Sequence, residues 1–334
     1  MRIFFDERQL GHAPEIELHN GAFVPFAEHP GRVRSILDAV GPTEAPRDHG
    51  EAALLRVHPQ PYLDFLKSAW RDWRAAGREG DAVGYSWPVV RRRPLPLDRI
   101  DAKLGLYSYD ASTPIAEGSW DAAYWSAQAA LSAIEAVLGG DRTTFALCRP
   151  PGHHCGADYI GGYCYLNAAA IAAQAALAAG RRRVAILDVD YHHGNGTQDI
   201  FYARGDVLFV SIHADPRTDY PFFWGHADET GEGDGEGATL NLPLPRCTTM
   251  REYAPALDAA LERIAAFGPD LLICSYGADT FAGDPISHFA IETEDYPVIA
   301  RRIAALGVPT AIVMEGGYAV DRLGANVAAF LSGF

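Results

Sequence analysis

Acidic and imidazole side chains alternate in the run Asp-Val-Asp-Tyr-His at residues 188–192, which directly follows an apolar segment. Alternate side chains of an extended strand point to the same face, so Asp188, Asp190 and His192 should share one face where a strand ends. Two buried carboxylates need a cation to offset their repulsion and desolvation, and carboxylate with imidazole suits zinc or a similar divalent ion. The alternative is that Asp188 and Asp190 cap the following turn.

A further metal ligand should come from another strand end. Asp279 is the best candidate, because it follows a segment too apolar to be a surface strand. Three protein ligands would leave one coordination position open, which is the arrangement of a catalytic zinc site rather than a structural one. The alternative is that Asp279 caps the next helix.

Two other groups could act beside the metal. His153 and His154 follow the stiff turn Arg-Pro-Pro-Gly, and such a pair suggests one general base and one partner held by a carboxylate. Tyr318 follows Glu-Gly-Gly. The glycines let the backbone bend toward the site, so the phenol could donate a hydrogen bond to a developing oxyanion. The alternatives are a structural role for the histidines and a packing role for the tyrosine.

Hydrophobic periodicity predicts the scaffold that would bring these distant residues together. Short apolar runs predict buried parallel strands at residues 2–5, 144–148, 184–189, 207–212, 271–275 and 310–314. Ala- and Leu-rich patterns predict helices at residues 120–138, 167–179, 250–266, 296–306 and 321–331. The alternation predicts a parallel sheet covered on both faces, with the reactive residues beyond the carboxyl ends of its strands. With no break in composition, we expect one α/β domain over residues 1–334, least regular in its N-terminal third.

Composition narrows the classes of function. The 334 residues carry a formal net charge of −15, which argues against a nucleic-acid binder and is compatible with a cationic small-molecule partner. We find no apolar run of about 18 residues that would predict a membrane span, and no apolar segment that would predict a signal peptide. The five cysteines are odd in number and lack CxxC spacing, which favours a reducing compartment. We therefore expect a cytoplasmic protein with no nucleic-acid or membrane partner.

Seven short motifs follow one another between Phe145 and Tyr318. They are RPPGHH, GGYCYLN, ILDVDYHHGNGTQDIFY, VSIHAD, GEGDGEG, YGADTFAGDP and MEGGY. In this order they resemble the zinc-dependent, histone deacetylase-like enzymes of the arginase–deacetylase fold family. The N-terminal segment 2–32 and the long loop before Asp101 are similar to those of bacterial acetylpolyamine amidohydrolases. The resemblance implies a central, mostly parallel eight-stranded sheet with helices on both faces.

The resemblance also implies the catalytic residues. The zinc ligands would be Asp190, His192 and Asp279. His154 would be the general base that activates water and later protonates the leaving amine, while His153, hydrogen-bonded to Asp188, would act electrostatically. Tyr318 would polarise the scissile carbonyl together with zinc. Asn195 occupies the position that orients the second histidine of the pair, where many relatives carry Asp.

A narrow substrate tunnel is implied as well. Tyr163 and Phe223 would form its aromatic walls, and the carbonyl of Gly162 would accept the substrate amide N–H. Glu17 and Asp101 would attract the distal ammonium of an acetylated polyamine near the tunnel mouth, an encounter that the negative net charge would assist. The alternative for Glu17 is a solvated loop acid.

Two more partners follow from the same resemblance. A potassium ion beside the zinc site would be bound by Asp188 and Ser211, with backbone carbonyl groups of residues 190, 192 and 212. In the polyamine enzymes, the loop before Asp101 builds a homodimer that narrows the entrance to the site. Trp87 and the arginines at 91–93 would take part in such a contact here.

Four functions compete at this point. The first is a zinc-dependent amidohydrolase that removes acetyl groups from acetylated polyamines or related acetyl-amines. The second is an acetyl-lysine protein deacetylase, or a broad amide or ester hydrolase, on the same scaffold. A non-catalytic acyl-amine sensor is disfavoured because His153, His154 and Tyr318 are all present. A binuclear manganese ureohydrolase is disfavoured because the run after His192 lacks the additional aspartates.

Overall fold

Uninterrupted apolar segments form a central parallel sheet. The computed structural model describes residues 1–88 and 96–334, and within them the main sheet has seven strands in the order β1-β4-β9-β8-β5-β6-β7, with every neighbouring pair parallel. The strands are β1 (Arg2–Phe4), β4 (Thr143–Ala146), β5 (Val184–Asp188), β6 (Val207–Ala214), β7 (Thr239–Leu244), β8 (Leu271–Tyr276) and β9 (Thr310–Met314).

The predicted α/β class is confirmed, and so are the six predicted strands, but the expected number of eight strands is wrong. The main sheet has seven in the part of the chain that the structure describes. One of the seven, β7, was not predicted. It lies at the edge of the sheet, pairs only with β6 and is half-buried rather than fully buried. It also contains Pro243, which an edge strand tolerates because one side of its backbone needs no ladder hydrogen bond.

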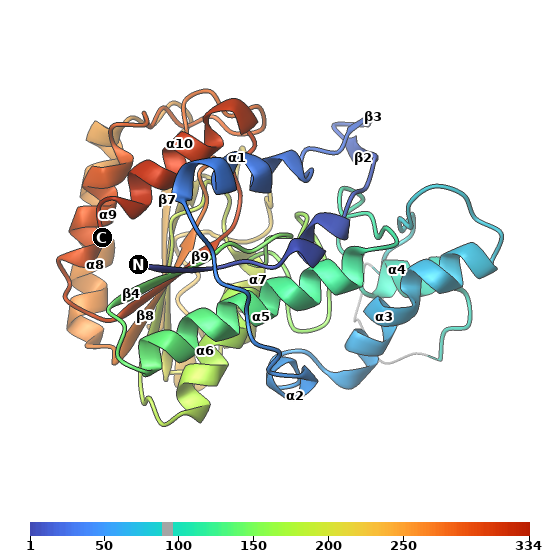
Figure 1. Cartoon of the computed structure of the whole chain (residues 1–334), viewed down its shortest axis with the longest axis horizontal. Helices are drawn as coiled ribbons and strands as arrows, with labels where there is room; N and C mark the ends of the chain where they lie inside the picture. The colour runs from blue at the N-terminus through green and yellow to red at the C-terminus, as the bar shows by residue number, and fades with distance from the viewer. Residues whose placement is uncertain (89–95) are drawn as a thin grey trace.

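Helices cover both faces of the sheet. The helices are α1 (Gly31–Val40), α2 (Glu51–Leu54), α3 (Gln60–Ala75), α4 (Ile100–Leu106), α5 (Ser119–Leu138), α6 (Ala168–Ala178), α7 (Asn195–Phe201), α8 (Met250–Phe267), α9 (Tyr296–Ala304) and α10 (Val320–Leu331). On one face α5 and α6 pack on the central strands, and on the other α8, α9, α10 and α1 form a continuous row (Figure 1). The five predicted helices are confirmed, whereas α1, α2, α3 and α4 in the N-terminal third were missed, and so was the short α7. No helix among the described residues is both long and apolar enough to cross a bilayer.

A small antiparallel hairpin stands apart from the main sheet (Figure 1). It consists of β2 (Ile16–His19) and β3 (Ala22–Pro25), joined by Asn20 and Gly21. Both turn residues have positive φ, 49° and 79°, and an Asn-Gly pair adopts such angles at little cost. The hairpin carries Glu17, so its position decides where that carboxylate lies.

The face covered by α10 depends on aromatic packing. Phe330 of α10 is fully buried and stacks on Tyr276 at the end of β8, with ring centroids 3.8 Å apart. Because Asp279 follows β8 by a few residues, this contact helps to fix the end of the strand that leads into the site.

We expect Phe330→Ala to lower the free energy of unfolding by about 3–5 kcal/mol, since it removes a buried ring and leaves a cavity. Urea unfolding followed by circular dichroism measures the change. Phe334→Ala is the matched control, because that ring also contacts Phe330 but is only half-buried. A decrease for Phe330→Ala no larger than that for the control would contradict this interpretation.

Candidate metal and catalytic site

Three potential metal ligands meet beyond the carboxyl ends of two neighbouring strands. Asp190 and His192 follow β5, and Asp279 follows β8, which is paired with β5. His192 Nδ1 lies 3.0 Å from Asp279 Oδ2 and 3.4 Å from Asp190 Oδ1. All three side chains are buried, and one ligand atom from each lies within 4.8 Å of the others. The structure thus brings together the residues that the sequence singled out.

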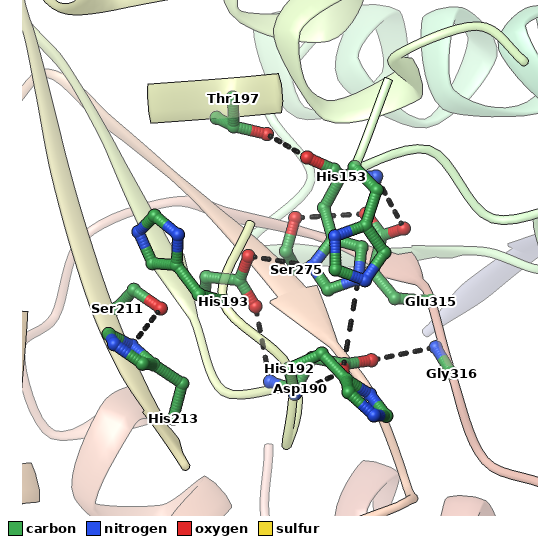
Figure 2. Close-up of polar contacts among 12 residues, drawn as sticks. His153, Asp190, His192, His193, Thr197, Ser211, His213, Ser275, Glu315 and Gly316 are labelled. Atoms are coloured by element: carbon green, nitrogen blue, oxygen red, sulfur yellow. Dashed lines mark hydrogen bonds and ion pairs between the residues drawn. The ribbon is translucent and has the colours of Figure 1, made fainter. Parts of the chain in front are cut away.

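Backbone groups hold the two carboxylates in place. The N–H of Gly316 donates to Asp190 Oδ2 at 2.8 Å (Figure 2), and the N–H of Tyr191 donates to Asp279 Oδ1 at 2.9 Å. A Cβ on Gly316 would lie 2.5 Å from Asp279 Oδ2 and 2.7 Å from Asp190 Oδ2. Only glycine therefore allows the backbone to approach both acids this closely.

The charges of the cluster fit a divalent cation. Burial and the nearby negative charge of Asp190 raise the pKa of Asp279 to about 7. Burial alone would lower the pKa of His192, but hydrogen bonds to Asp190 and Asp279 raise it to about 10. The two buried carboxylates share one positively charged partner, the protonated ring of His192. A divalent cation bound by two carboxylate oxygens and one imidazole nitrogen would balance the negative charge.

A second group, His153, Cys164 and Glu315, also has ligand atoms within 4.8 Å of one another. In this group, both carboxylate oxygens of Glu315 already accept hydrogen bonds. Glu315 Oε2 accepts the N–H groups of Gly152 and His153 at 2.7 and 3.1 Å, and Oε1 accepts the Ser275 hydroxyl at 3.0 Å. Figure 2 shows Glu315 between Ser275 and His153. The carboxylate therefore braces the turn that carries the histidine pair, a role that sequence reasoning missed although the MEGGY motif contains this residue.

The two adjacent histidines have different partners. His153 Nδ1 lies 3.0 Å from Asp188 Oδ2, whereas His154 Nδ1 lies 2.7 Å from Asn195 Oδ1. The ring centroids are 4.1 Å apart. Both rings are buried. One ring is thus bound to a carboxylate, and its neighbour to a neutral amide.

These partners separate the two pKa values. Burial alone would lower the pKa of His153, but the charges of Asp190 and Asp188 raise it to about 10. Burial, together with positive charge on His153 and His192, lowers the pKa of His154 well below its ordinary value. At neutral pH His153 is therefore cationic and His154 neutral. Because Asn195 Oδ1 accepts the proton on Nδ1, Nε2 of His154 carries the lone pair that can accept another proton.

A pocket of about 160 Å³ opens above this cluster, and its lining includes His154, Gly162, Tyr163, His192 and Tyr318. Tyr318 packs against the ring of Tyr163, with centroids 5.6 Å apart. Burial raises the pKa of the Tyr318 phenol well above its ordinary value. The phenol therefore keeps its proton and can donate a hydrogen bond.

The predicted substrate residues are not all at this pocket. Gly162 and Tyr163 line it, and Glu17 lies behind Tyr163, accepting its hydroxyl at 3.0 Å. Burial raises the pKa of Glu17 to about 7. Phe223 is 79% exposed and lines an adjacent chamber of about 820 Å³. Asp101 is absent from the lining of both cavities.

Asp101 is held elsewhere by two arginines. Its carboxylate accepts Arg78 at 3.0 Å and Arg99 at 2.7 Å at the start of α4. These ion pairs neutralise the charge that was expected to attract an ammonium group. The arginines predicted at 91–93 for a subunit contact lie outside the described residues, whereas Trp87 donates to Ser108 at 2.9 Å.

The residues predicted to bind potassium lie on neighbouring strands. Asp188 is the last residue of β5, and its register partner on β6 is Ser211. The Ser211 hydroxyl lies 2.8 Å from His213 Nδ1 (Figure 2). The Asp188 carboxylate bonds to His153 and accepts the N–H of Asp190 at 3.1 Å. Asp188 thus links the histidine pair to the end of β5, where Asp190 and His192 follow.

Comparisons with known proteins agree with this arrangement. A profile of the histone deacetylase domain matches residues 26–334. Acetylpolyamine amidohydrolase 1 of Pseudomonas aeruginosa is 50% identical over 100% of this chain and 98% of the relative. Acetylpolyamine amidohydrolase of Mycoplana ramosa is 47% identical over 100% of this chain and 99% of the relative.

A solved structure gives the same result for the fold. The crystal structure of an acetylpolyamine aminohydrolase from Burkholderia pseudomallei superposes with a TM-score of 0.96 and 42% sequence identity, covering 100% of this chain and 98% of that one. The predicted family resemblance is confirmed: the chain belongs to the histone deacetylase domain family.

Proposed function

We propose that residues 1–334 form a single-domain, zinc-dependent amidohydrolase that removes acetyl groups from acetylated polyamines or related acetyl-amines. The observation that carries the proposal is the buried cluster of Asp190, His192 and Asp279, with neutral His154 and protonated Tyr318 lining the pocket above it. Relatives named acetylpolyamine amidohydrolases, about half identical over the full chain, support the class of substrate.

Asp190, His192 and Asp279 would hold the zinc ion, because two carboxylates and one imidazole are a donor set that suits it. A bound zinc ion supplies Lewis acidity for the carbonyl oxygen and makes water acidic enough to react near neutral pH. Asp188 and Ser211 would contribute to a potassium site beside it, where a cation would offset part of the buried negative charge.

The side chains of the pocket supply the proton transfers. His154 Nε2 is unprotonated at neutral pH and would take a proton from the attacking water, then return it to the departing amine nitrogen. Asn195 fixes the orientation of that ring through Nδ1. Tyr318 would donate a hydrogen bond to the carbonyl oxygen as negative charge develops there. Such a donor typically lowers the activation free energy by about 3–4 kcal/mol.

Residues farther out would select the amine. Tyr163 would flank the extended chain of the substrate, and the carbonyl of Gly162 would accept its amide N–H. Glu17, which is buried behind Tyr163 and accepts its hydroxyl, would add negative charge beside the pocket and so favour a distal ammonium group. Phe223 would form a wall of the adjacent chamber. We leave Asp101 out of this set because Arg78 and Arg99 already neutralise it.

We also propose that the protein acts as a cytoplasmic homodimer without nucleic-acid or membrane partners. Large apolar side chains are exposed on the hairpin and on the loop beside the pocket, where a second copy could cover them: Ile16, Phe23, Phe222 and Phe223. All five cysteines are free and four are buried, which suits a reducing compartment. The formal charge of −15 disfavours a nucleic acid.

The substrate class can be tested with acetylputrescine, acetylspermidine, an acetyl-lysine peptide and N-pentylacetamide, in which a methyl group replaces the ammonium group of acetylputrescine. We expect kcat/KM for the acetylpolyamines to exceed that for the peptide and the uncharged amide by about tenfold or more. The His154→Ala variant is the control for catalysis at this site. A peptide that is the better substrate would favour the alternative, a protein deacetylase, and equal rates would favour a broad hydrolase.

Asp279→Ala should release zinc, because it removes one of three protein ligands and leaves two. Elemental analysis of the purified, dialysed variant measures the zinc content per chain. Asp270→Ala is the matched control, since Asp270 directly precedes β8 and Asp279 follows it at the other end. Wild-type zinc content in Asp279→Ala would contradict the proposed set of ligands.

The pH dependence of kcat/KM tests the base. His154 must be neutral to accept a proton, and its pKa lies below the ordinary 6.5, so activity should persist below pH 6.5 and fall only as His154 becomes protonated. Asn195→Asp places a negative charge beside Nδ1, which favours the protonated ring. The acidic limb should therefore move to higher pH by about 1–2 units.

The Tyr109→Phe variant is the control for this pH profile. The Tyr109 hydroxyl also donates to Asn195 Oδ1, at 3.3 Å, so its removal disturbs the same amide without adding charge. The acidic limb of this variant should stay where it is in the wild type. An acidic limb that does not move in Asn195→Asp would rule out His154 as the base.

A further inference from the structure

The segment that carries Tyr318 has little stiffness of its own. Two glycines precede the tyrosine, and Gly317 has φ of +124°, an angle that residues with a Cβ rarely adopt. Glycine leaves the backbone many alternative conformations. Contacts outside the segment must therefore decide where the Tyr318 phenol points.

A buried carboxylate supplies such contacts. Asp284 is 8% exposed, and its Oδ2 accepts the N–H of Tyr318 at 2.6 Å and the N–H of Ala319 at 3.2 Å. None of the ion pairs among the described residues involves Asp284. A buried carboxylate is costly unless hydrogen bonds satisfy it, and here backbone N–H groups do so.

The other oxygen of the same carboxylate holds a second residue of the pocket lining. Asp284 Oδ1 accepts the N–H of Ile286 at 3.1 Å, and Ile286 lines the pocket together with Tyr318. Ile286 also packs against the cluster of Phe26, Tyr163 and Tyr318. One side chain thus ties the segment after β8 to the segment after β9.

A second side chain, Arg32, bonds carbonyl groups of the Tyr318 segment. Arg32 donates to the carbonyl oxygens of Glu315 and Gly317, both at 2.6 Å, and its guanidinium lies 4.9 Å from the centre of the Tyr318 ring. Arg32 thus bonds carbonyl groups before the tyrosine in the chain, and Asp284 bonds the N–H groups of the tyrosine and of the residue after it. If either side chain were replaced, the flexible glycines would allow the phenol to turn away.

We propose that Asp284 is a positioning residue for Tyr318, which holds the main chain of the tyrosine so that the phenol faces the reacting carbonyl. This inference rests on the hydrogen-bonding role of Tyr318 in the proposed function. It assigns a task to the carboxylate of the YGADTFAGDP motif that does not touch the metal cluster. Asp284 acts on the reaction only through the tyrosine, so its effect should vanish when the phenol is gone.

A double-mutant cycle tests this dependence. Asp284→Asn is nearly isosteric but replaces one acceptor oxygen with a donor, so at least one of the three N–H groups is left without its partner. We expect kcat with acetylputrescine to fall about 10- to 100-fold with KM changed much less, because misplacement of a catalytic group by about 1 Å has effects of that size. In the Tyr318→Phe background, Asp284→Asn should lower kcat by less than about twofold.

Two controls separate positioning from loss of structure. In Asp270, one carboxylate oxygen accepts the N–H groups of Arg182 and Arg183 at 2.7 and 3.1 Å, so Asp270→Asn makes the same change from carboxylate to amide beside backbone N–H groups away from the pocket and should leave kcat unchanged. Zinc content should equal that of the wild type in every variant. If Asp284→Asn does not fold, Asp284→Glu takes its place in the cycle, since it keeps the charge but moves the carboxylate.

The outcomes of the cycle are distinct. If Tyr318→Phe lowers kcat but the two substitutions combine by simple multiplication, the positioning role is overturned while the proposed function stands. Unchanged kcat in both Asp284→Asn and Asp284→Glu has the same meaning. Unchanged kcat in Tyr318→Phe overturns both the role of the tyrosine and that of Asp284.

Discussion

The burial of two carboxylates beside one imidazole is the constraint on which the rest of the site depends. Asp190 and Asp279 are both fully buried, and His192 Nδ1 is close to each of them. An ion that leaves water costs several kcal/mol in a protein interior unless other groups compensate. Backbone N–H groups provide part of the compensation, and a divalent cation would provide the remainder. The segments after β5, β8 and β9 must therefore keep a fixed arrangement for the acids to be stable at all.

The same constraint explains why the reactive residues lie where strands end. Inside a sheet, the backbone N–H groups are used by the ladder, but beyond the last ladder bond they are free to turn toward an anion. The N–H groups of Tyr191 and Gly316 do so for Asp279 and Asp190, and those of Gly152 and His153 do so for Glu315. The glycine at 316 is required because a Cβ there would meet both carboxylates.

Sequence patterns could predict what is local in the chain and could not predict what depends on distant partners. The buried strands are uninterrupted apolar runs, so their pattern is unambiguous. In the edge strand β7, polar residues and a proline interrupt the apolar run. The ion pair of Asp101 with Arg78 could not be predicted, because Arg78 is 23 residues away in the sequence and reaches Asp101 only in the fold. The contact of Asp284 with Tyr318 spans 34 residues and involves a backbone N–H, which no side-chain pattern encodes.

His153 and His154 have the same side chain, so the difference between their pKa values comes from their surroundings. Burial lowers the pKa of both rings, and only His153 has carboxylates close enough to reverse that effect. A neutral amide at Asn195 orients its neighbour without adding charge, so His154 stays unprotonated. A divalent cation at the adjacent cluster would lower the pKa of His154 further. Orientation by an amide and repulsion by a cation thus act in the same direction, and both keep Nε2 available as a proton acceptor.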